Sequence, residues 1–300
     1  MEGLVKLSFY CFAAASLSLG ASAFCFILYT VGKVRLQQAT LRTSTGTIIT
    51  SNTAQFSPGS ESAARFGSLL AWFGMAMAFF AVLTRSIAAE RIPMANMFEF
   101  SLSFTFVISA MYVNFERFYK TRHLGAIVMS LAFGMTLYMW MLPADLREVN
   151  PLIPALQARP IMTVHVSSAI LAYATFTVSF AAAVLYLITM NRHISWLPSP
   201  DMLDDVGFRA VTIGFPLLSL VLILGSVWAH DAWGVYWSWD PKETAALFTW
   251  LVYAVYLHTR TLRGMRGRGS AYILLFGFAA TVFTYYGNYF FGGLHAYGGV

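Results

Sequence analysis

Eight long apolar segments dominate this 300-residue chain and restrict what it can fold into. A helix needs about 20 apolar residues to cross the hydrocarbon core of a bilayer. Within lipid, a helix satisfies its own backbone N–H and C=O groups, which an open strand or a loop does not. The sequence therefore predicts an all-α, polytopic integral membrane protein with about eight transmembrane helices, forming one membrane domain over residues 1–300. The segments span 7–31, 66–84, 97–115, 124–142, 165–189, 211–229, 244–258 and 270–291.

Charged residues are scarce and unevenly placed. Only 11% of the residues are charged, against about 25% in soluble domains, so membrane lipid is the expected solvent for most of the surface. Thirteen of the nineteen lysines and arginines fall in the segments 32–65, 116–123, 190–210 and 259–269. Positive charge favours the cytoplasm, so we predict these segments inside, 32–65 as a flexible connector, and both termini outside. The net charge of +6 is spread over short loops and does not indicate nucleic-acid binding.

Residues 228–243 are rich in tryptophan, and we predict that they form an external loop on the outer face. This tryptophan-rich segment contains Trp228, Trp233, Trp237 and Trp239, four of the eight tryptophans in the chain. An aromatic belt at the membrane interface explains one or two such residues at a helix end, but explains four within twelve residues poorly. A dense indole cluster favours instead a platform for a large planar ligand such as a porphyrin.

Polar residues stand at two expected helix starts on the predicted outer face. Asp240, Pro241 and Glu243 match an N-cap residue, a first-turn proline and a capping-box partner, so a structural role there is at least as well supported as a catalytic one. Asn96 and Glu99 stand at the start of the predicted third helix. A lipid-facing Glu99 would be costly, so its carboxylate is expected to face the bundle interior or to cap an N–H group.

Histidines supply the axial ligands that haem iron requires. His165 and His295 are 130 residues apart in sequence, yet the predicted topology puts both on the face that carries the tryptophans. We therefore expect them to hold one iron from both sides. His258 lies about 26 Å along the seventh helix from its start, at about 1.5 Å per residue, which excludes it from the outer site. An ionisable group at that depth is a functional candidate, although a helix-end histidine beside Arg260 is an equal alternative.

The remaining histidines give weaker signals. His123 and His193 lie among basic residues in predicted cytoplasmic loops, and we interpret them as solvated. His230 lies inside the tryptophan-rich segment, where a role at the rim of the site is favoured over ligation.

The spacing of Trp233, Gly234, Trp237, Trp239 and Asp240 resembles the WWD signature of haem-handling proteins. The overall layout is similar to the CcsA (ResC) branch of System II cytochrome c biogenesis. This resemblance implies that His165 and His295 are the external haem ligands. It implies that His258 is a ligand of an internal transmembrane haem site whose second ligand comes from a CcsB (ResB) partner. The stretch 96–99 resembles the Asn-Met-Tyr-Glu segment of the family, with Phe98 in place of the tyrosine.

The resemblance also implies a function. Such a chain is a haem-handling subunit of a cytochrome c synthase that binds haem b and presents it on the outer face of a bacterial inner membrane or a thylakoid membrane. It supports thioether attachment to an apocytochrome c whose CxxCH cysteines a thioredoxin-like protein keeps reduced. This chain has no CxxCH of its own. The alternatives are a CcmC-like protein that loads a haem chaperone, a haem or electron carrier, and a structural assembly subunit.

Overall fold

The protein is described by a computed structural model that covers residues 2–44, 58–157, 160–191, 194, 196–262, 265–287 and 291–295. These residues form eight α-helices, three 3-10 turns and no strand. The helices are α1 (Glu2–Ser44), α2 (Pro58–Ala89), α3 (Met97–Tyr119), α4 (Gly125–Met141), α5 (Ile161–Thr189), α6 (Pro200–Trp233), α7 (Pro241–Leu262) and α8 (Arg268–Tyr286), and the turns are η1 (Arg122–Leu124), η2 (Ala144–Arg147) and η3 (Pro154–Gln157).

The predicted fold class is confirmed, since each apolar segment lies largely within one helix. Seven of the described helices are long and apolar enough to cross a membrane, and α7 falls short of that standard. The surface also carries many exposed large apolar side chains, among them Leu17 at 77% and Met141 at 83% exposed. Such a surface is unfavourable in water and suits a hydrocarbon solvent.

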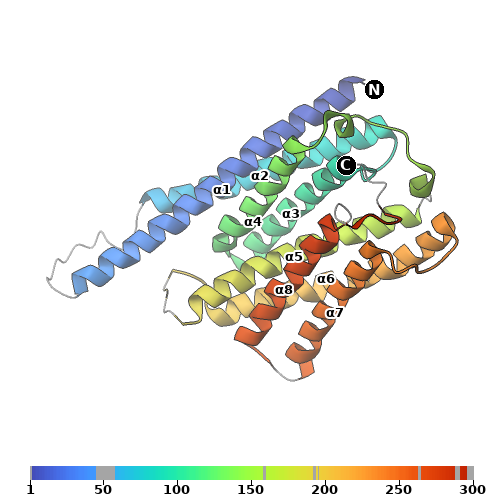
Figure 1. The fold of residues 1–300 in the computed structure, drawn as a ribbon. Helices are drawn as coiled ribbons and strands as arrows, with labels where there is room; N and C mark the ends of the chain where they lie inside the picture. Colours follow the sequence, from blue (N-terminus) through green and yellow to red (C-terminus); the bar gives the residue numbers. More distant parts are fainter. Residues whose placement is uncertain are drawn as a thin grey trace.

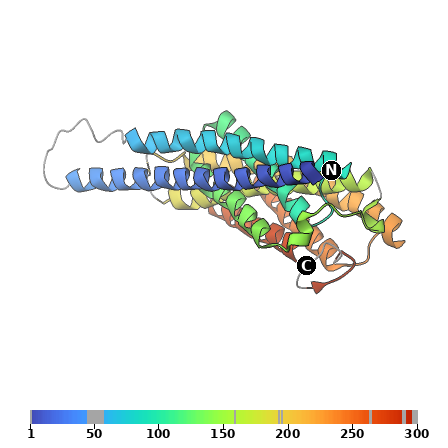
Figure 2. The same cartoon turned by 90° about the horizontal axis from the view of Figure 1, so that it is seen from above.

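The helices form two groups of four. Helices α1 to α4 pack on one another, as do α5 to α8, and the contact of α3 with α5 joins the groups. Figure 1 shows the first group above the second, and Figure 2 shows α1 and α2 side by side along one flank. Helix α5 contacts α3, α6 and α8, and its buried face is rich in small residues such as Ala172, Ala174 and Ala182. Small side chains let helix backbones approach closely in membranes.

Helices α1, α2 and α6 extend beyond their apolar segments. Residues 32–44 and 58–65, predicted to belong to a flexible connector, are helical, so that prediction is wrong for them, while 45–57 lie outside the described residues. The Nζ of Lys33 on α1 lies 2.6 Å from Oε1 of Glu61 on α2, and this ion pair joins the two extensions. At the other end, α6 continues to Trp233, which changes the interpretation of the tryptophan-rich segment.

Candidate functional site

The tryptophan-rich segment 228–243 is not one loop. Residues up to Trp233 form the last turns of α6, and α7 begins at Pro241, so only residues 234–240 connect the two helices. Gly234 ends α6 with a positive φ of 79°, the left-handed conformation that glycine adopts without a Cβ penalty. The prediction of an external loop over 228–243 is therefore wrong for residues 228–233 and 241–243, which are helical.

The four tryptophans form two perpendicular pairs and not a single flat surface. The rings of Trp228 and Trp233 meet at 73° with centroids 4.6 Å apart, and those of Trp237 and Trp239 meet at 90° with centroids 5.7 Å apart. Trp228 is only 1% exposed, and its Nε1 donates to the carbonyl of Ala155 at 2.8 Å. Trp239 is 69% exposed. Trp228 thus belongs to the protein interior and Trp239 to the surface, while Trp233 and Trp237 are half-buried.

His165 stands in the second turn of α5 and packs against α6. Its Nδ1 lies 3.0 Å from the carbonyl oxygen of Val221. The approach depends on Gly225, since a Cβ there would lie 2.7 Å from Cε1 of the imidazole. The ring also lies nearly parallel to Trp228, at 16° and 6.3 Å between centroids.

His295 is held by Asp240 across the start of α7. The Nδ1 of His295 lies 2.9 Å from Oδ1 of Asp240, and Oδ2 accepts the backbone N–H of Leu294 at 2.6 Å. The same carboxylate caps α7 through the N–H of Lys242 at 2.9 Å. Asp240 is therefore both the predicted N-cap and, beyond the prediction, the residue that positions His295.

Both imidazole rings lie beside the indole of Trp228 and line the same cavity. The ring of His295 lies 5.5 Å from that of Trp228 and 4.8 Å from that of Trp233, between centroids. His165 and His295 both line a cavity of about 150 Å³ between α3, α5, α6, α7 and α8. The structure thus brings together the two predicted ligands, although one stands near the start of α5 and the other follows α8 in the sequence.

The hydrogen bonds fix the tautomer of each neutral ring. Val221 O and the Asp240 carboxylate only accept, so the proton of each neutral imidazole must be on Nδ1. Nε2 then carries the lone pair that can coordinate a metal. A ligating histidine usually donates its other N–H to a carbonyl or a carboxylate in this way, and both acceptor types occur here.

Burial, together with the nearby Lys242 ammonium, lowers the pKa of His295 to about 4, although Asp240 acts in the opposite direction. At neutral pH the imidazole is therefore uncharged, and its contact with Asp240 is a hydrogen bond from a neutral donor. Burial alone would raise the pKa of Asp240, but the backbone N–H of Lys242 and the His295 ring hold it below its ordinary value. The site therefore keeps a charged acceptor beside a neutral ligand.

Among the described residues that line the cavity, one is a lysine or arginine, and it is Lys242. None of the described carboxylates forms an ion pair with it. The Asp240 oxygens are taken by Lys242 N–H, Leu294 N–H and His295. Glu243 also lines the cavity, but its Oε2 accepts the N–H groups of Ser238 and Asp240 at 2.9 and 3.2 Å, which confirms the predicted capping box. The ammonium of Lys242 is thus available to an anionic group of a ligand.

Asn96 and Glu99 fix the rim of the cavity that α3 contributes. Asn96 lines the cavity, and its side chain caps α3 by accepting the N–H of Glu99 at 2.9 Å. Glu99 is fully buried and pairs with Arg85 and Arg91 at 3.1 and 2.6 Å. Its Oε2 also accepts the N–H of Ala95 at 2.9 Å, so both expected roles, interior facing and capping, are confirmed.

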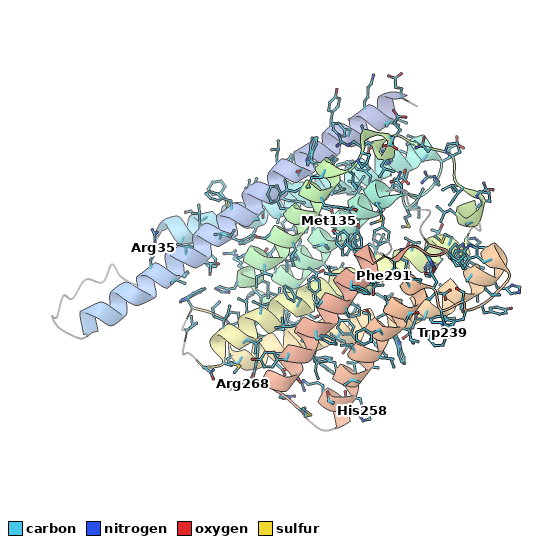
Figure 3. The ribbon with its side chains drawn as sticks, in the orientation of Figure 1. Arg35, Met135, Trp239, His258, Arg268 and Phe291 are labelled. Carbon is cyan, nitrogen blue, oxygen red and sulfur yellow. The ribbon has the colours of Figure 1, made fainter. Side chains whose placement is uncertain are left out.

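The other histidines lie away from this cavity. His258 is on the surface of α7, and Figure 3 shows it at the opposite end of that helix from Trp239. His230 stacks on Tyr236 with 4.3 Å between ring centroids, and it is not among the described residues that line the cavity. His123 is not solvated as predicted: its Nε2 lies 2.9 Å from the Tyr29 hydroxyl and its ring packs on Trp196. His193 lies outside the described residues.

Sequence reasoning missed three contributors to the site. Val221 acts through its backbone carbonyl, which no residue-type pattern reveals. Gly225 is one of 22 glycines, and only the packing of His165 against it gives it a role. Of the three, Lys242 alone could have been found from the sequence. It stands in the first turn of an apolar helix, three residues after a tryptophan, and a lysine there is costly to bury without an anion.

Together the fold and the site define a polytopic helical membrane protein with a tryptophan-lined cavity between two positioned histidines. Residues 66–295 match the family of cytochrome C assembly proteins, and the chain belongs to that family. The cytochrome c biogenesis protein CcsA of Guillardia theta is 36% identical over 244 residues, covering 72% of this chain and 79% of the relative. The CcsA protein of Synechococcus sp. (strain JA-3-3Ab) is 33% identical over 292 residues, covering 77% and 85%.

A solved structure shares the fold. The cytochrome c haem lyase CcmF superposes with a TM-score of 0.61 at 18% identity, over 93% of this chain. This chain spans 46% of the length of CcmF, so the likeness covers less than half of that protein and concerns the fold alone. The family and the CcsA relatives place this chain in cytochrome c biogenesis, as the WWD spacing predicted.

Proposed function

We propose that this chain binds haem between His165 and His295 and presents it for covalent attachment to apocytochrome c. One observation carries the proposal: two imidazoles on one cavity each have Nδ1 bound to an acceptor, at 3.0 Å from Val221 O and 2.9 Å from Asp240 Oδ1. That arrangement directs Nε2 of each neutral ring to a metal. Family membership supports the same substrate.

The residues of the cavity suit a porphyrin in three respects. The indoles of Trp228 and Trp237, which line the cavity, offer apolar, polarisable contact to a tetrapyrrole ring. Lys242 offers a cation to a propionate carboxylate. The cavity, at about 150 Å³, is below the roughly 300–1,000 Å³ typical of ligand pockets, so haem binding requires it to widen. The connection 234–240 and the segment 291–295 cover it and are the elements we expect to move.

The chain itself contributes positioning. Haem as substrate brings the vinyl groups, and an apocytochrome with a reduced CxxCH brings the thiols. Each S–H adds across one vinyl C=C, forming a C–S and a C–H bond with no leaving group and no net electron transfer. Fixed imidazoles and indoles orient the vinyl edge, and such orientation accelerates a reaction between two held partners. A thioredoxin-like protein keeps the thiols reduced.

We further propose that the site faces the extracytoplasmic or lumenal side and that the chain acts with a CcsB/ResB-like membrane protein. The majority of the lysines and arginines lie at the opposite end, which favours that end for the cytoplasm. His258 is exposed on α7 at that opposite end. Because its side chain faces outward, an internal haem held there would need its second ligand from a partner helix.

The test is the absorption spectrum of the chain, co-purified with its partner, after replacement of the histidines. His165→Ala combined with His295→Ala should remove the low-spin spectrum of outer-site haem and abolish cytochrome c maturation. His230→Ala replaces an exposed histidine outside the cavity lining; it is the matched control and should change neither. An unchanged haem spectrum with intact maturation in the double variant would refute the proposal.

A further inference from the structure

A second cavity, of about 810 Å³, lies between α2, α3 and η1, at the opposite end of the bundle from the histidine site. We call it the α2–α3 basic cavity. Its volume is more than five times that of the histidine cavity. It is lined by Tyr29, Arg65, Ser68, Leu69, Trp72, Val113, Glu116, Arg117, Lys120, Arg122 and His123.

The two helices present matching faces to this cavity. On α2 the lining residues fall at 65, 68, 69 and 72, and on α3 at 113, 116, 117 and 120, the spacing of one face of a helix. On α2 the face runs from the cation Arg65 to the apolar Leu69 and Trp72. On α3, which is antiparallel, it runs from the apolar Val113 to the cations Arg117 and Lys120. Both faces are therefore cationic at the end of the bundle and apolar toward its middle.

The positive charge of the cavity is largely uncompensated. Arg122 is shared between Glu116 at 3.4 Å and Glu61 at 4.0 Å, and Glu116 also accepts the Ser68 hydroxyl. Among the described carboxylates, none forms an ion pair with Arg65, Arg117 or Lys120. Three cations around one hollow favour an anionic ligand there.

The apolar part of the cavity continues onto the lipid-facing surface. Leu69 is 64% exposed and Trp72 is 45% exposed on α2, and Phe66 beside them is 62% exposed. A ligand with an acidic head at Arg65, Arg117 and Lys120 therefore has an apolar path beneath it. A phospholipid, with an anionic phosphate and apolar acyl chains, matches this arrangement. Basic pockets between transmembrane helices bind such anionic headgroups.

The histidine in the cavity does not favour an iron porphyrin. The Nε2 of His123 lies 2.9 Å from the Tyr29 hydroxyl, and its Nδ1 is buried without a hydrogen-bond partner among the described residues, so neither nitrogen is open to a ligand in the cavity. We therefore propose that the α2–α3 basic cavity is a binding site for one anionic phospholipid, with its phosphate held by Arg65, Arg117 and Lys120 and an acyl chain along Leu69 and Trp72. A bound lipid would bridge α2 and α3 at this end.

The experiment measures lipid binding to the purified full chain by native mass spectrometry, with phosphatidylglycerol and phosphatidylcholine titrated separately. The test variant is Arg65→Gln, Arg117→Gln and Lys120→Gln. The control variant, Arg35→Gln, Arg266→Gln and Arg268→Gln, removes the same charge from exposed arginines at the same end of the bundle.

The wild type should prefer phosphatidylglycerol. The test variant should lose roughly a hundredfold in that affinity, at about fivefold per cation near an anionic headgroup, while the control keeps it. Equal losses in both variants, or no preference in the wild type, would overturn the proposal. Displacement of phosphatidylglycerol by equimolar haemin would overturn it in favour of a carboxylate ligand. If the triple variant does not fold, Arg117→Gln alone should lose about fivefold.

Discussion

Asp240 is the residue on which the arrangement of the proposed haem site most depends. Its side chain is 1% exposed, and it accepts three hydrogen bonds, from His295 Nδ1 at 2.9 Å, Leu294 N–H at 2.6 Å and Lys242 N–H at 2.9 Å. Asp240→Ala would leave all three donors without an acceptor. Asp240→Asn would keep one oxygen for His295 and Lys242 but would place an NH2 group against the N–H of Leu294.

The magnitude follows from these three bonds. Loss of the α7 cap costs about 1 kcal/mol, and each bond to a charged acceptor contributes about 1.5–3 kcal/mol. The cap bond acts on α7, so Asp240→Ala removes the two bonds from His295 and Leu294 that hold the docked segment 291–295. That segment should be destabilised by about 3 kcal/mol or more, enough to release His295 from the cavity. Asp240→Asn should lose about half as much. Loss of such a partner of a ligating histidine typically lowers metal-site affinity by about 10–100-fold.

The assay is haem content and the Soret and visible bands of the purified complex, with and without added imidazole. Asp240→Ala should shift outer-site haem toward a five-coordinate, high-spin spectrum, and exogenous imidazole should restore the six-coordinate form. Asp231→Asn is the matched control, because Asp231 has a 51% exposed side chain and lies 3.7 Å from His230, outside the cavity lining. A wild-type spectrum and unchanged haem affinity in Asp240→Ala would refute the reasoning.

Three further perturbations test other parts of the site. Gly225→Ala should displace His165, since the new Cβ would lie 2.7 Å from its ring, and resonance Raman should report a weakened axial ligand; an unchanged iron–histidine band would contradict this. Lys242→Met should reduce affinity for haem by roughly tenfold, the lower end of the range for one charge-assisted hydrogen bond, but leave affinity for haem dimethyl ester unchanged, and equal losses for both porphyrins would count against a carboxylate contact. Glu99→Gln should destabilise the fold by about 3–5 kcal/mol, because it leaves the buried guanidinium of Arg85 without its charge partner; thermal unfolding in detergent measures this, and an unchanged midpoint would disprove it.

The helical architecture was accessible to sequence reasoning because it depends on local properties. The length of an apolar run decides whether a helix spans, and the cap residues at Asn96 and Asp240 act within two or three positions along the chain. Even so, the length of the apolar runs did not predict where the helices end. The polar extensions of α1 and α2 are held by contacts between helices, such as the Lys33–Glu61 pair, and hydropathy carries no information about those.

What the sequence determined by itself is a bundle of membrane helices, with a tryptophan spacing and two histidines, predicted on one face, that point to haem. Tertiary structure decided how these residues meet: Trp228 inside the protein and Trp239 outside, His165 bound to a carbonyl 56 residues away, and His295 bound to a carboxylate 55 residues away. The physical reason is the range of the interactions. Hydrophobic transfer and capping act on segments already contiguous in the chain, whereas the orientation of a ring depends on which backbone and side-chain atoms helix packing brings within 3 Å of it.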